Sequence, residues 1–438
     1  MKSKFIKSTI ILLIGGFISK ILGMIIKVVL TRVVSTEGIG LYMLVLPTFN
    51  LFITLCSLGL PTAISKMVSE KRTNNKKIVL SIIKPIIIYN IILIIILYAI
   101  SPILSKYLLN NNDTYYPLIA IGLTLPFICI SGIIKGYFFG KEKMIPHTIS
   151  NITEQLVRLF LTIFYIPKLL SYGLNIAITG VVLINILSEL SSIITLMFFL
   201  PKNEIITKDD FKRDKTIEKD VLNISIPTTG SRLIGSFVYF LEPIILTYTL
   251  VKSGYSNSFI TNEYGIINGY VFPLLLMPSF FTMAISNALL PTVSNAYSHG
   301  HYKYTRSKIK QAIFFCLLIG IPITIILTLI PEIPLKLIYN TSEGLEYIKI
   351  VAPFFILHYI QSPLTSAMQA MGKATSAMVG TLCGSLLRIL ILIVTGFLKI
   401  GLWGLIIATI SNFIFVTIHH IYYVNKYLKE KNNIKFSH

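Results

Sequence analysis

Two short segments of the chain place a cation inside an apolar run. They are Ser19-Lys20-Ile21-Leu22-Gly23 and Ser231-Arg232-Leu233-Ile234-Gly235, so the second begins 212 positions after the first. A charge at the centre of a membrane-length helix costs at least roughly 2.5–3.5 kcal/mol and therefore needs a wet cavity or an opposite charge. We expect Lys20 and Arg232 to face such a cavity and to attract an anionic ligand there.

Other charged residues lie at comparable depth in apolar runs. Lys27 follows Lys20 by seven positions on overlapping faces of one predicted helix, and Glu154 and Arg158 are one turn apart and able to pair. A purely structural ion pair is an equally good interpretation of Glu154 and Arg158. The candidate substrate-binding residues are Lys20, Lys27, Arg232, Arg158, Glu154, Arg388, Ser19 and Ser231.

The composition shows what kind of element must position these residues. The 438-residue chain is 54% hydrophobic and 13% charged, whereas a soluble domain is about 25% charged. Its apolar runs reach the ~20 residues that cross a bilayer as a helix, and they lack the period-two alternation of barrel strands. We expect an all-α polytopic membrane protein with about twelve spans, at residues 8–31, 40–65, 79–104, 116–139, 146–167, 176–200, 221–250, 264–291, 308–330, 347–371, 376–398 and 402–424.

The distribution of basic residues predicts the topology. If the N-terminus is cytoplasmic, 26 of the 39 Lys and Arg residues fall in the N-terminus, the even-numbered connections or the tail, and seven fall on the opposite side. The 26 include Lys135, Lys141 and Lys143, which are counted in one cytoplasmic connection. This positive-inside bias predicts a multi-pass protein of the bacterial cytoplasmic membrane with both termini cytoplasmic. It also accounts for most of the net charge of +21, so nucleic-acid binding is not expected.

Several sequence echoes indicate an internal duplication. Leu60-Pro61-Thr62 is matched by Leu290-Pro291-Thr292, and Gly140-Lys141 with a later Arg158 is matched by Gly372-Lys373 with a later Arg388. Six helices per half is an even number, so the halves form two parallel six-helix bundles, which we expect to enclose a central cavity. The predicted domains are residues 1–200, a cytoplasmic linker at 201–220, and residues 221–438.

The sequence contains no motif of a common enzyme class. The four cysteines are isolated from one another, and neither HExxH nor GxSxG occurs. The seven histidines are expected mostly in loops, helix ends or the tail and suggest no metal set. We therefore expect no enzymatic activity, no metal site and no cofactor, although a coupling ion such as H⁺ or Na⁺ stays open.

The first two predicted helices resemble a known family. Ile18-Ser19-Lys20-Ile21-Leu22-Gly23 and Gly59-Leu60-Pro61-Thr62-Ala63-Ile64-Ser65 are similar to the polysaccharide-flippase branch of the multidrug/oligosaccharidyl-lipid/polysaccharide exporter superfamily. Gly136-Tyr137-Phe138-Phe139-Gly140 and Glu154-Gln155-Leu156-Val157-Arg158 add to the resemblance, which spans the chain and is looser in its C-terminal half.

The resemblance implies a function. Members of this branch move lipid-linked sugar precursors outward by alternating access, and in the lipid II flippases cations of helix one meet the substrate pyrophosphate, a role that Lys20 would take here. Lys27 is displaced by one position from their next arginine, Leu46-Pro47 is not followed by their arginine pattern, and many relatives have fourteen helices rather than twelve.

We therefore expect a flippase for an undecaprenyl-pyrophosphate-linked oligosaccharide or peptidoglycan precursor, serving cell-envelope or spore-cortex synthesis. A cation-coupled multidrug or small-molecule antiporter of the same superfamily is the alternative, with Glu154, Glu189 and Glu242 available as its acids. The expected partners are the lipid-linked glycan and membrane lipids, with envelope-synthesis enzymes as further candidates, and we expect a monomer.

Overall fold

Helices form the whole regular structure of the described part of the chain. The computed structural model describes residues 2–70, 75–200 and 214–434, and within these ranges it contains no strand. Contacts between helices divide the chain into two compact bundles, residues 1–244 (unit 1) and residues 245–438 (unit 2). The all-α prediction is confirmed. The predicted linker at 201–220 falls mostly on residues 201–213, which lie outside the described residues, and the predicted domain boundaries stay a prediction.

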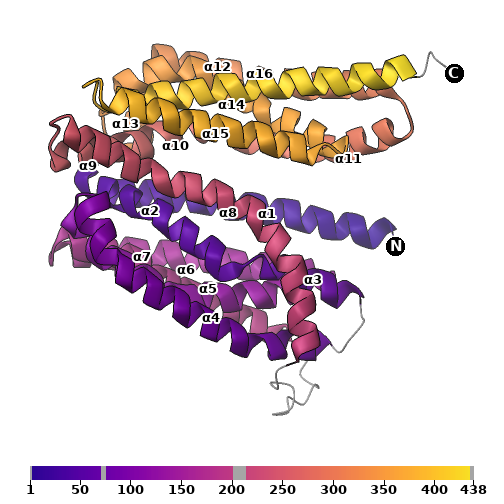
Figure 1. Ribbon diagram of the computed structural model, residues 1–438, viewed down its shortest axis with the longest axis horizontal. Coiled ribbons are helices and arrows are strands. Elements are labelled where there is room, and N and C mark those ends of the chain that lie inside the picture. The colour runs from indigo at the N-terminus through magenta and orange to yellow at the C-terminus, as the bar shows by residue number, and fades with distance from the viewer. Residues whose placement is uncertain (1, 71–74, 201–213, 435–438) are drawn as a thin grey trace. The chain divides into compact units, whose positions relative to one another are not determined.

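Unit 1 is a bundle in which long helices lie side by side, as Figure 1 shows for α4, α5, α6 and α7. Its elements are α1 (Lys2–Val33), α2 (Thr36–Ser57), α3 (Leu60–Glu70), α4 (Asn75–Ile103), the π-helical turn η1 (Leu104–Leu108), the 3₁₀ turn η2 (Asn112–Thr114), α5 (Tyr115–Gly140), α6 (Met144–Leu170), α7 (Leu174–Phe198) and most of α8 (Lys215–Lys252).

Unit 2 repeats this plan, and Figure 1 shows α12, α14, α15 and α16 lying along one another. It contains the end of α8, α9 (Asn257–Gly265), the π-helical turn η4 (Ile266–Val271), α10 (Phe272–Leu276), α11 (Ser279–Ser298), α12 (Tyr302–Leu329), α13 (Glu332–Tyr339), α14 (Leu345–Ala370), α15 (Ala374–Gly396) and α16 (Trp403–Ile434).

Most of the long helices qualify as membrane spans. Among the described residues, nine helices are long and apolar enough to cross a bilayer, and the pair Asn257–Leu276 and Ser279–Ser298, bent by 49°, gives a tenth. The other two predicted spans are α6 and α14, which have membrane-spanning lengths of 27 and 26 residues but carry more polar side chains. The twelve predicted spans thus correspond to twelve helical segments, and the more polar ones are the helices to examine for a site.

The sequence echoes fall at equivalent places in the order of helices, although Arg232 belongs to unit 1 together with most of α8. Lys20 lies in α1 and Arg232 in α8, each in the first long helix of its half. The second span of each half is broken, at Leu58–Gly59 between α2 and α3 and at Met277–Pro278 between α10 and α11. Leu58 and Gly59 both have positive φ, 42° and 64°, which ends α2 and lets the chain restart as α3.

Glycines allow α3 and α5 to pack closely. A Cβ at Gly136 would lie 2.7 Å from the Pro61 carbonyl oxygen, and one at Gly140 would lie 2.6 Å from the Ser65 carbonyl oxygen. Small residues let membrane helices approach to backbone contact in this way. The Gly136–Gly140 segment therefore has a packing role in the helix pair.

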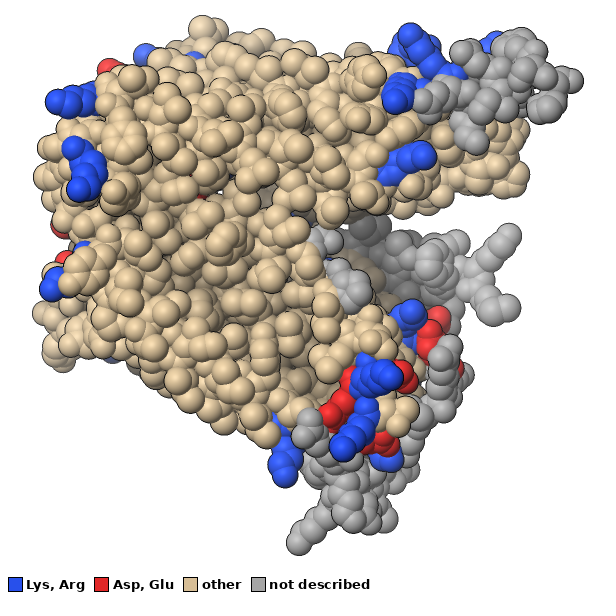
Figure 2. Space-filling model, viewed as in Figure 1, with Lys and Arg blue, Asp and Glu red and all other residues tan. Residues whose placement is uncertain are grey.

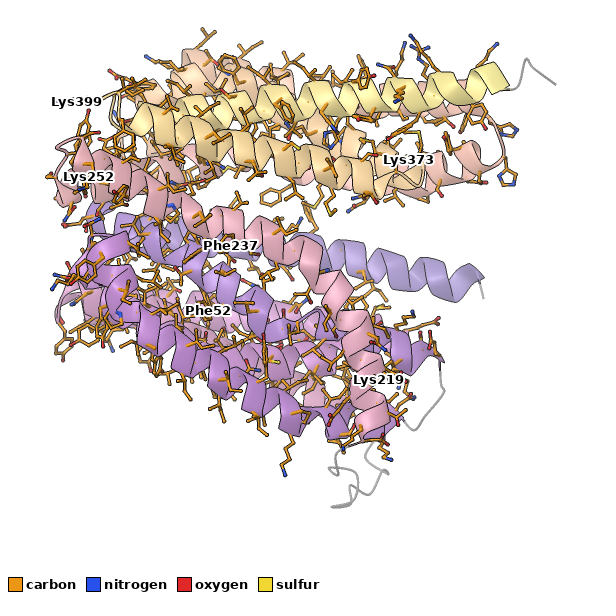
Figure 3. The ribbon with its side chains drawn as sticks, viewed as in Figure 1. Phe52, Lys219, Phe237, Lys252, Lys373 and Lys399 are labelled. Carbon is orange, nitrogen blue, oxygen red and sulfur yellow. The ribbon has the colours of Figure 1, made fainter. Side chains whose placement is uncertain are left out.

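The charged side chains visible in Figure 2 gather near helix ends, and uncharged residues cover the middle of that face within each unit. Figure 3 illustrates this for α15, where Lys373 and Lys399 lie at opposite ends of the helix. This distribution is what a bilayer requires, because a lysine near a helix end can extend its ammonium group to the interface.

Candidate functional site

The interior of unit 1 contains a cluster of charged side chains from three helices. Lys135 of α5 donates from Nζ to Glu154 Oε2 of α6 at 2.9 Å, and its Nζ lies 4.0 Å from Glu189 Oε2 of α7. The Lys135 side chain is 16% exposed, and each carboxylate side chain is 10% exposed. Charges removed from water to this extent persist only when they are paired, and Lys135 supplies the charge that both acids need.

Arg158 extends this cluster on the other side of Glu154. Its Nη2 donates to Glu154 Oε1 at 2.9 Å and approaches Ser188 Oγ at 3.4 Å. The predicted ion pair between Glu154 and Arg158 is therefore confirmed, and Glu154 accepts from a different cation on each of its oxygens. The cluster of Lys135, Glu154, Arg158 and Glu189 is close to electrically neutral as a whole.

Three atoms in or beside the cluster are buried without a hydrogen-bond partner. They are Glu189 Oε2, Arg158 Nε and Gln155 Oε1. Buried polar groups are almost always satisfied, by protein or by ordered water. A strong acceptor and a guanidinium donor left over beside one another indicate a place where water or a ligand completes the hydrogen bonding.

A pocket of about 190 Å³ adjoins this cluster, enclosed by α1, α2, α6 and α7. The polar side chains that line it are Lys27, Tyr42, Gln155, Arg158, Thr162 and Asn185. The structure thus brings together Lys27 and Arg158, which the sequence assigned to two separate helices. Both residues are cationic, so the pocket suits a small anionic group.

The other predicted residues have different positions. Lys20 and Arg232 are exposed side chains on α1 and α8, and Ser19 of α1 is partly buried with its Oγ atom unpartnered. The Ser231 side chain lies outside the described residues. Arg388 belongs to α15 of unit 2 and is half-buried there.

Exposed cations on helices that cross a membrane face either lipid or water. Facing the hydrocarbon is costly, so Lys20 and Arg232 need an aqueous surface.

Lys135 is the residue that the sequence reading missed. It was assigned to a cytoplasmic loop with Lys141 and Lys143, but it lies inside α5 with its ammonium between two carboxylates. A signal was available, because position 135 falls within the predicted span 116–139. Glu189 was noticed only as an acid at membrane depth, and no local pattern linked it to a residue 54 positions earlier.

Histidines form a second polar group, in unit 2. They were read as residues of loops, ends and tails, yet His358 lies in α14, and His419 and His420 lie in α16. The His419 and His420 ring centroids are 5.5 Å apart, and His420 is fully buried with its Nδ1 2.7 Å from the Val416 carbonyl oxygen. These three histidines lie within the predicted spans 347–371 and 402–424, so they are exceptions to the expectation that the histidines lie mostly in loops, helix ends or the tail.

Comparison with known families identifies the class of protein. Residues 5–297 match the family described as polysaccharide biosynthesis protein, and residues 268–394 match MatE. The first match covers well over half of the chain, so the chain belongs to the polysaccharide biosynthesis protein family. The resemblance drawn from the motifs of the first two helices is confirmed.

Two relatives from Bacillus subtilis (strain 168) place the chain more closely. Stage V sporulation protein B is 34% identical over 99% of this chain and 86% of its own length. Lipid II flippase MurJ is 21% identical, with 89% of this chain and 77% of the relative covered. The protein is a multi-pass membrane transporter or flippase of this superfamily rather than an enzyme.

Solved structures agree on the fold. An inward-facing multidrug resistance MATE family transporter of the MOP superfamily has a TM-score of 0.72 at 15% identity, covering 95% of this chain and 96% of that one. A MOP superfamily transporter from Pyrococcus furiosus has a TM-score of 0.59 at 14% identity, covering 98% and 96%. At such low identity these likenesses show the two-bundle membrane fold and nothing about the substrate.

Proposed function

We propose that this protein is a flippase that moves an undecaprenyl-pyrophosphate-linked oligosaccharide or peptidoglycan precursor across the bacterial cytoplasmic membrane. The observation that carries the proposal is the pocket of about 190 Å³ in unit 1, which Lys27 and Arg158 line together. A diphosphate needs cations at membrane depth, which are otherwise costly to keep there. The named functions of the two Bacillus subtilis relatives, in sporulation and in lipid II flipping, support the same substrate class.

The chemistry of each candidate residue indicates its role in substrate binding. Lys20, Lys27 and Arg232 attract the anionic headgroup, and Ser19 and Ser231 beside two of these cations donate further hydrogen bonds. Arg158 offers its unpartnered Nε to the substrate while Glu154 holds its other end. Arg388, in α15 of unit 2, is a further candidate contact for the anionic headgroup.

The proposed direction of transport is outward, as the resemblance to the polysaccharide-flippase branch implies. The substrate would be taken up from the cytoplasmic leaflet, on the side where the excess of Lys and Arg in even-numbered connections places the termini. The product would then serve cell-envelope or spore-cortex synthesis. The coupling ion would be H⁺ or Na⁺, and envelope-synthesis enzymes that use the exported lipid are natural partners.

Mass spectrometry of lipids that co-purify with the protein tests this proposal directly. We expect an anionic polyprenyl-diphosphate glycan with the wild type and its loss in Lys20→Ala and Lys27→Ala, while Lys84→Ala, a cation of α4 outside the pocket, retains it. A double variant, Lys20→Ala with Arg232→Ala, should abolish transport and leave membrane insertion intact. Full transport by that double variant would overturn the proposal.

A cation-coupled drug antiporter is the second candidate, and one observation favours it. Glu189 is a buried carboxylate with an unpartnered Oε2 atom, which is the kind of group that binds a proton or a cationic drug. Efflux of an ethidium-like dye from cells, lost in Glu189→Gln, would favour this function. Because Lys135 already lies beside Glu189, we place this second.

A further inference from the structure

A second pocket, of about 350 Å³, lies in unit 2 and is separate from the residues discussed so far. Three segments that are distant in sequence form it: the junction of α9 and η4, the loop before α14, and the first residue of α16. Its principal lining residues are Glu263, Ile266, Ser342, Glu346, Tyr347 and Trp403. These segments belong to odd-numbered connections, which the charge bias predicts to be outside the cell.

An aromatic pair forms one wall of this pocket. The Tyr347 and Trp403 ring centroids are 4.6 Å apart with their planes tilted by 56°, so the two rings meet at an angle and leave a corner between them. Both side chains are only partly buried. Tyrosine and tryptophan are also common at membrane interfaces, but an interfacial anchor needs neither a pocket nor neighbouring acids.

Hydrogen bonding holds this wall in position. The Tyr347 hydroxyl donates to Glu263 Oε2 at 2.5 Å, joining α14 to α9. The loop before α14 is fixed as well: Gly344 has φ of 86°, and a Cβ there would lie 2.7 Å from Val271 Cγ2 and 2.8 Å from Ile266 Cγ2. Only glycine fits this close approach without strain, so the shape of the pocket is built into the fold.

The charge of the lining selects the type of ligand. Among the described residues that line the pocket, Glu263 and Glu346 are acidic and none is Lys or Arg. Such a surface repels a phosphate, so this pocket is unsuited to the group proposed for unit 1. It suits a ligand that donates several hydrogen bonds and has an apolar face, since carboxylates are strong acceptors and aromatic rings bury apolar surface.

We propose that this pocket binds a sugar ring. Its volume, at the small end of ligand pockets, fits a monosaccharide or disaccharide. The apolar C–H face of the ring packs on Trp403, and sugar hydroxyls donate to Glu346 and to the oxygen of Glu263 that Tyr347 leaves unoccupied. Side-chain acceptors from two chain segments, Glu263 on one and Ser342 and Glu346 on the other, line the space, which suits several hydroxyl donors better than a single ammonium group.

The position of the pocket gives the sugar a role in transport, and this step rests on the proposed function. A lipid-linked glycan that leaves the protein on the outer side would meet the pocket with its sugars while its diphosphate is still bound elsewhere. Sugar binding itself does not depend on that role. If the pocket binds free sugars but the co-purified lipids contain no lipid-linked glycan, the sugar site stands and the proposed flippase function is rejected.

The chain offers a built-in probe, because Trp403 is its only tryptophan. We would titrate the purified full-length protein in nanodiscs with N-acetylglucosamine and its β-1,4-linked disaccharide, and record tryptophan emission. A saturable change at millimolar concentration is expected, with tighter binding of the disaccharide. Inorganic phosphate should cause no change.

Variants make the test decisive. Glu346→Gln should weaken sugar binding by roughly tenfold, because it replaces a charged acceptor with a neutral one. Tyr347→Phe should also weaken sugar binding, because it removes the hydrogen bond that holds the Glu263 carboxylate in position. The matched control, Glu332→Gln, removes an exposed acid of α13 that lies outside the pocket and should bind like the wild type.

Trp403→Phe replaces the ring on which the sugar packs and also removes the fluorescent reporter, so its sugar binding is measured by calorimetry. This variant should bind sugar less tightly than the wild type. No saturable response to either sugar, or unchanged affinity in Glu346→Gln, would overturn the proposal. A stronger response to lysine amide than to the sugars would assign the pocket to cationic peptides instead.

Discussion

Units 1 and 2 contain the same order of long helices but use different polar groups in their interiors. Unit 1 buries Lys135, Glu154, Arg158 and Glu189 as a charge cluster across α5, α6 and α7. Unit 2 instead buries His420 of α16, and Gln361 of α14 donates to the Phe413 carbonyl and to Thr417. The helix plan therefore constrains packing, whereas the chemistry of each half is free to diverge.

This difference indicates that the two units bind different parts of a ligand. Ion pairs at membrane depth are costly unless complete, so unit 1 keeps them where a pocket and an anionic ligand can use them. Unit 2 carries acids instead in its sugar-type pocket at the ends of its helices. The following predictions test this contrast, starting from the largest expected effect.

Breaking the charge cluster should destabilise unit 1 most. Glu154→Ala leaves Lys135 and Arg158 without the carboxylate that they share, and removing one partner of a buried pair typically costs about 3–5 kcal/mol. Thermal unfolding in detergent, measured by circular dichroism, checks this. Glu332→Ala removes an exposed partner of Lys336 in unit 2 and should leave the melting temperature almost unchanged, because exposed ion pairs contribute little to stability. Similar melting temperatures for the two variants would contradict the contrast.

Removing a pocket cation should affect binding more than folding. Lys27→Gln removes one of the two cations that line the pocket, and we expect at least about a tenfold loss of co-purified anionic lipid with a normal melting temperature. Arg388→Gln in unit 2 should lose less, because the 190 Å³ pocket does not include it. A larger loss in Arg388→Gln would move the main anion site to unit 2.

Substituting two glycines, Gly380 in α15 and Gly235 in α8, compares a tightly packed helix face with an open one. In Gly380→Ala the new Cβ would lie 2.2 Å from His419 Nδ1, so the His419 ring or α15 itself must shift, at a cost of about 1–3 kcal/mol. Gly235→Ala in α8 meets nothing within 4 Å and should be neutral or slightly stabilising. Thermal unfolding of both variants measures this, and equal destabilisation would show that the histidine face of unit 2 is not tightly packed.

The smallest effect concerns the start of α8. A hydrogen bond from Lys77, 2.8 Å from Asp214 Oδ2, together with the backbone N–H groups of Ile217 and Thr216, lowers the pKa of Asp214 below its ordinary value. The lowered pKa stabilises the fold fully above the unfolded pKa of about 3.9 and loses this contribution as pH falls through the folded value.

Asp214→Asn should therefore unfold at a slightly lower temperature than the wild type near neutral pH. The two proteins should converge in acid below the folded pKa. A difference that persists unchanged in acid would assign the effect to packing rather than charge.

The helices were predictable because their physical cause is local. Apolar runs of bilayer length specify spans wherever they occur, and ten of the twelve predicted segments pass as membrane helices among the described residues. The pairing of Glu154 with Arg158 was predictable for the same reason, since one helical turn fixes their separation. The polarity of α6 also marked it as a helix that carries a site.

The role of Lys135 was not predictable in the same way. Its proximity to Lys141 and Lys143 suggested a loop, and only the packing of α5 against α6 and α7 shows its ammonium between Glu154 and Glu189. The pocket in unit 2 is a similar case, because Glu263, Tyr347 and Trp403 are separated by 84 and 56 positions. No periodicity relates residues at such distances.

By itself, the sequence determined the class of fold, the membrane setting, the repeat and the excess of cations within the spans. The reason is that each helix buried in a bilayer must satisfy its own backbone hydrogen bonds and be apolar along its length, so every spanning segment carries its own sequence signal. Only the tertiary structure decided which charges are paired, which atoms remain unsatisfied, and where sugar-type and phosphate-type pockets form. These depend on side chains that meet across helices, and helix packing, rather than chain order, sets those distances.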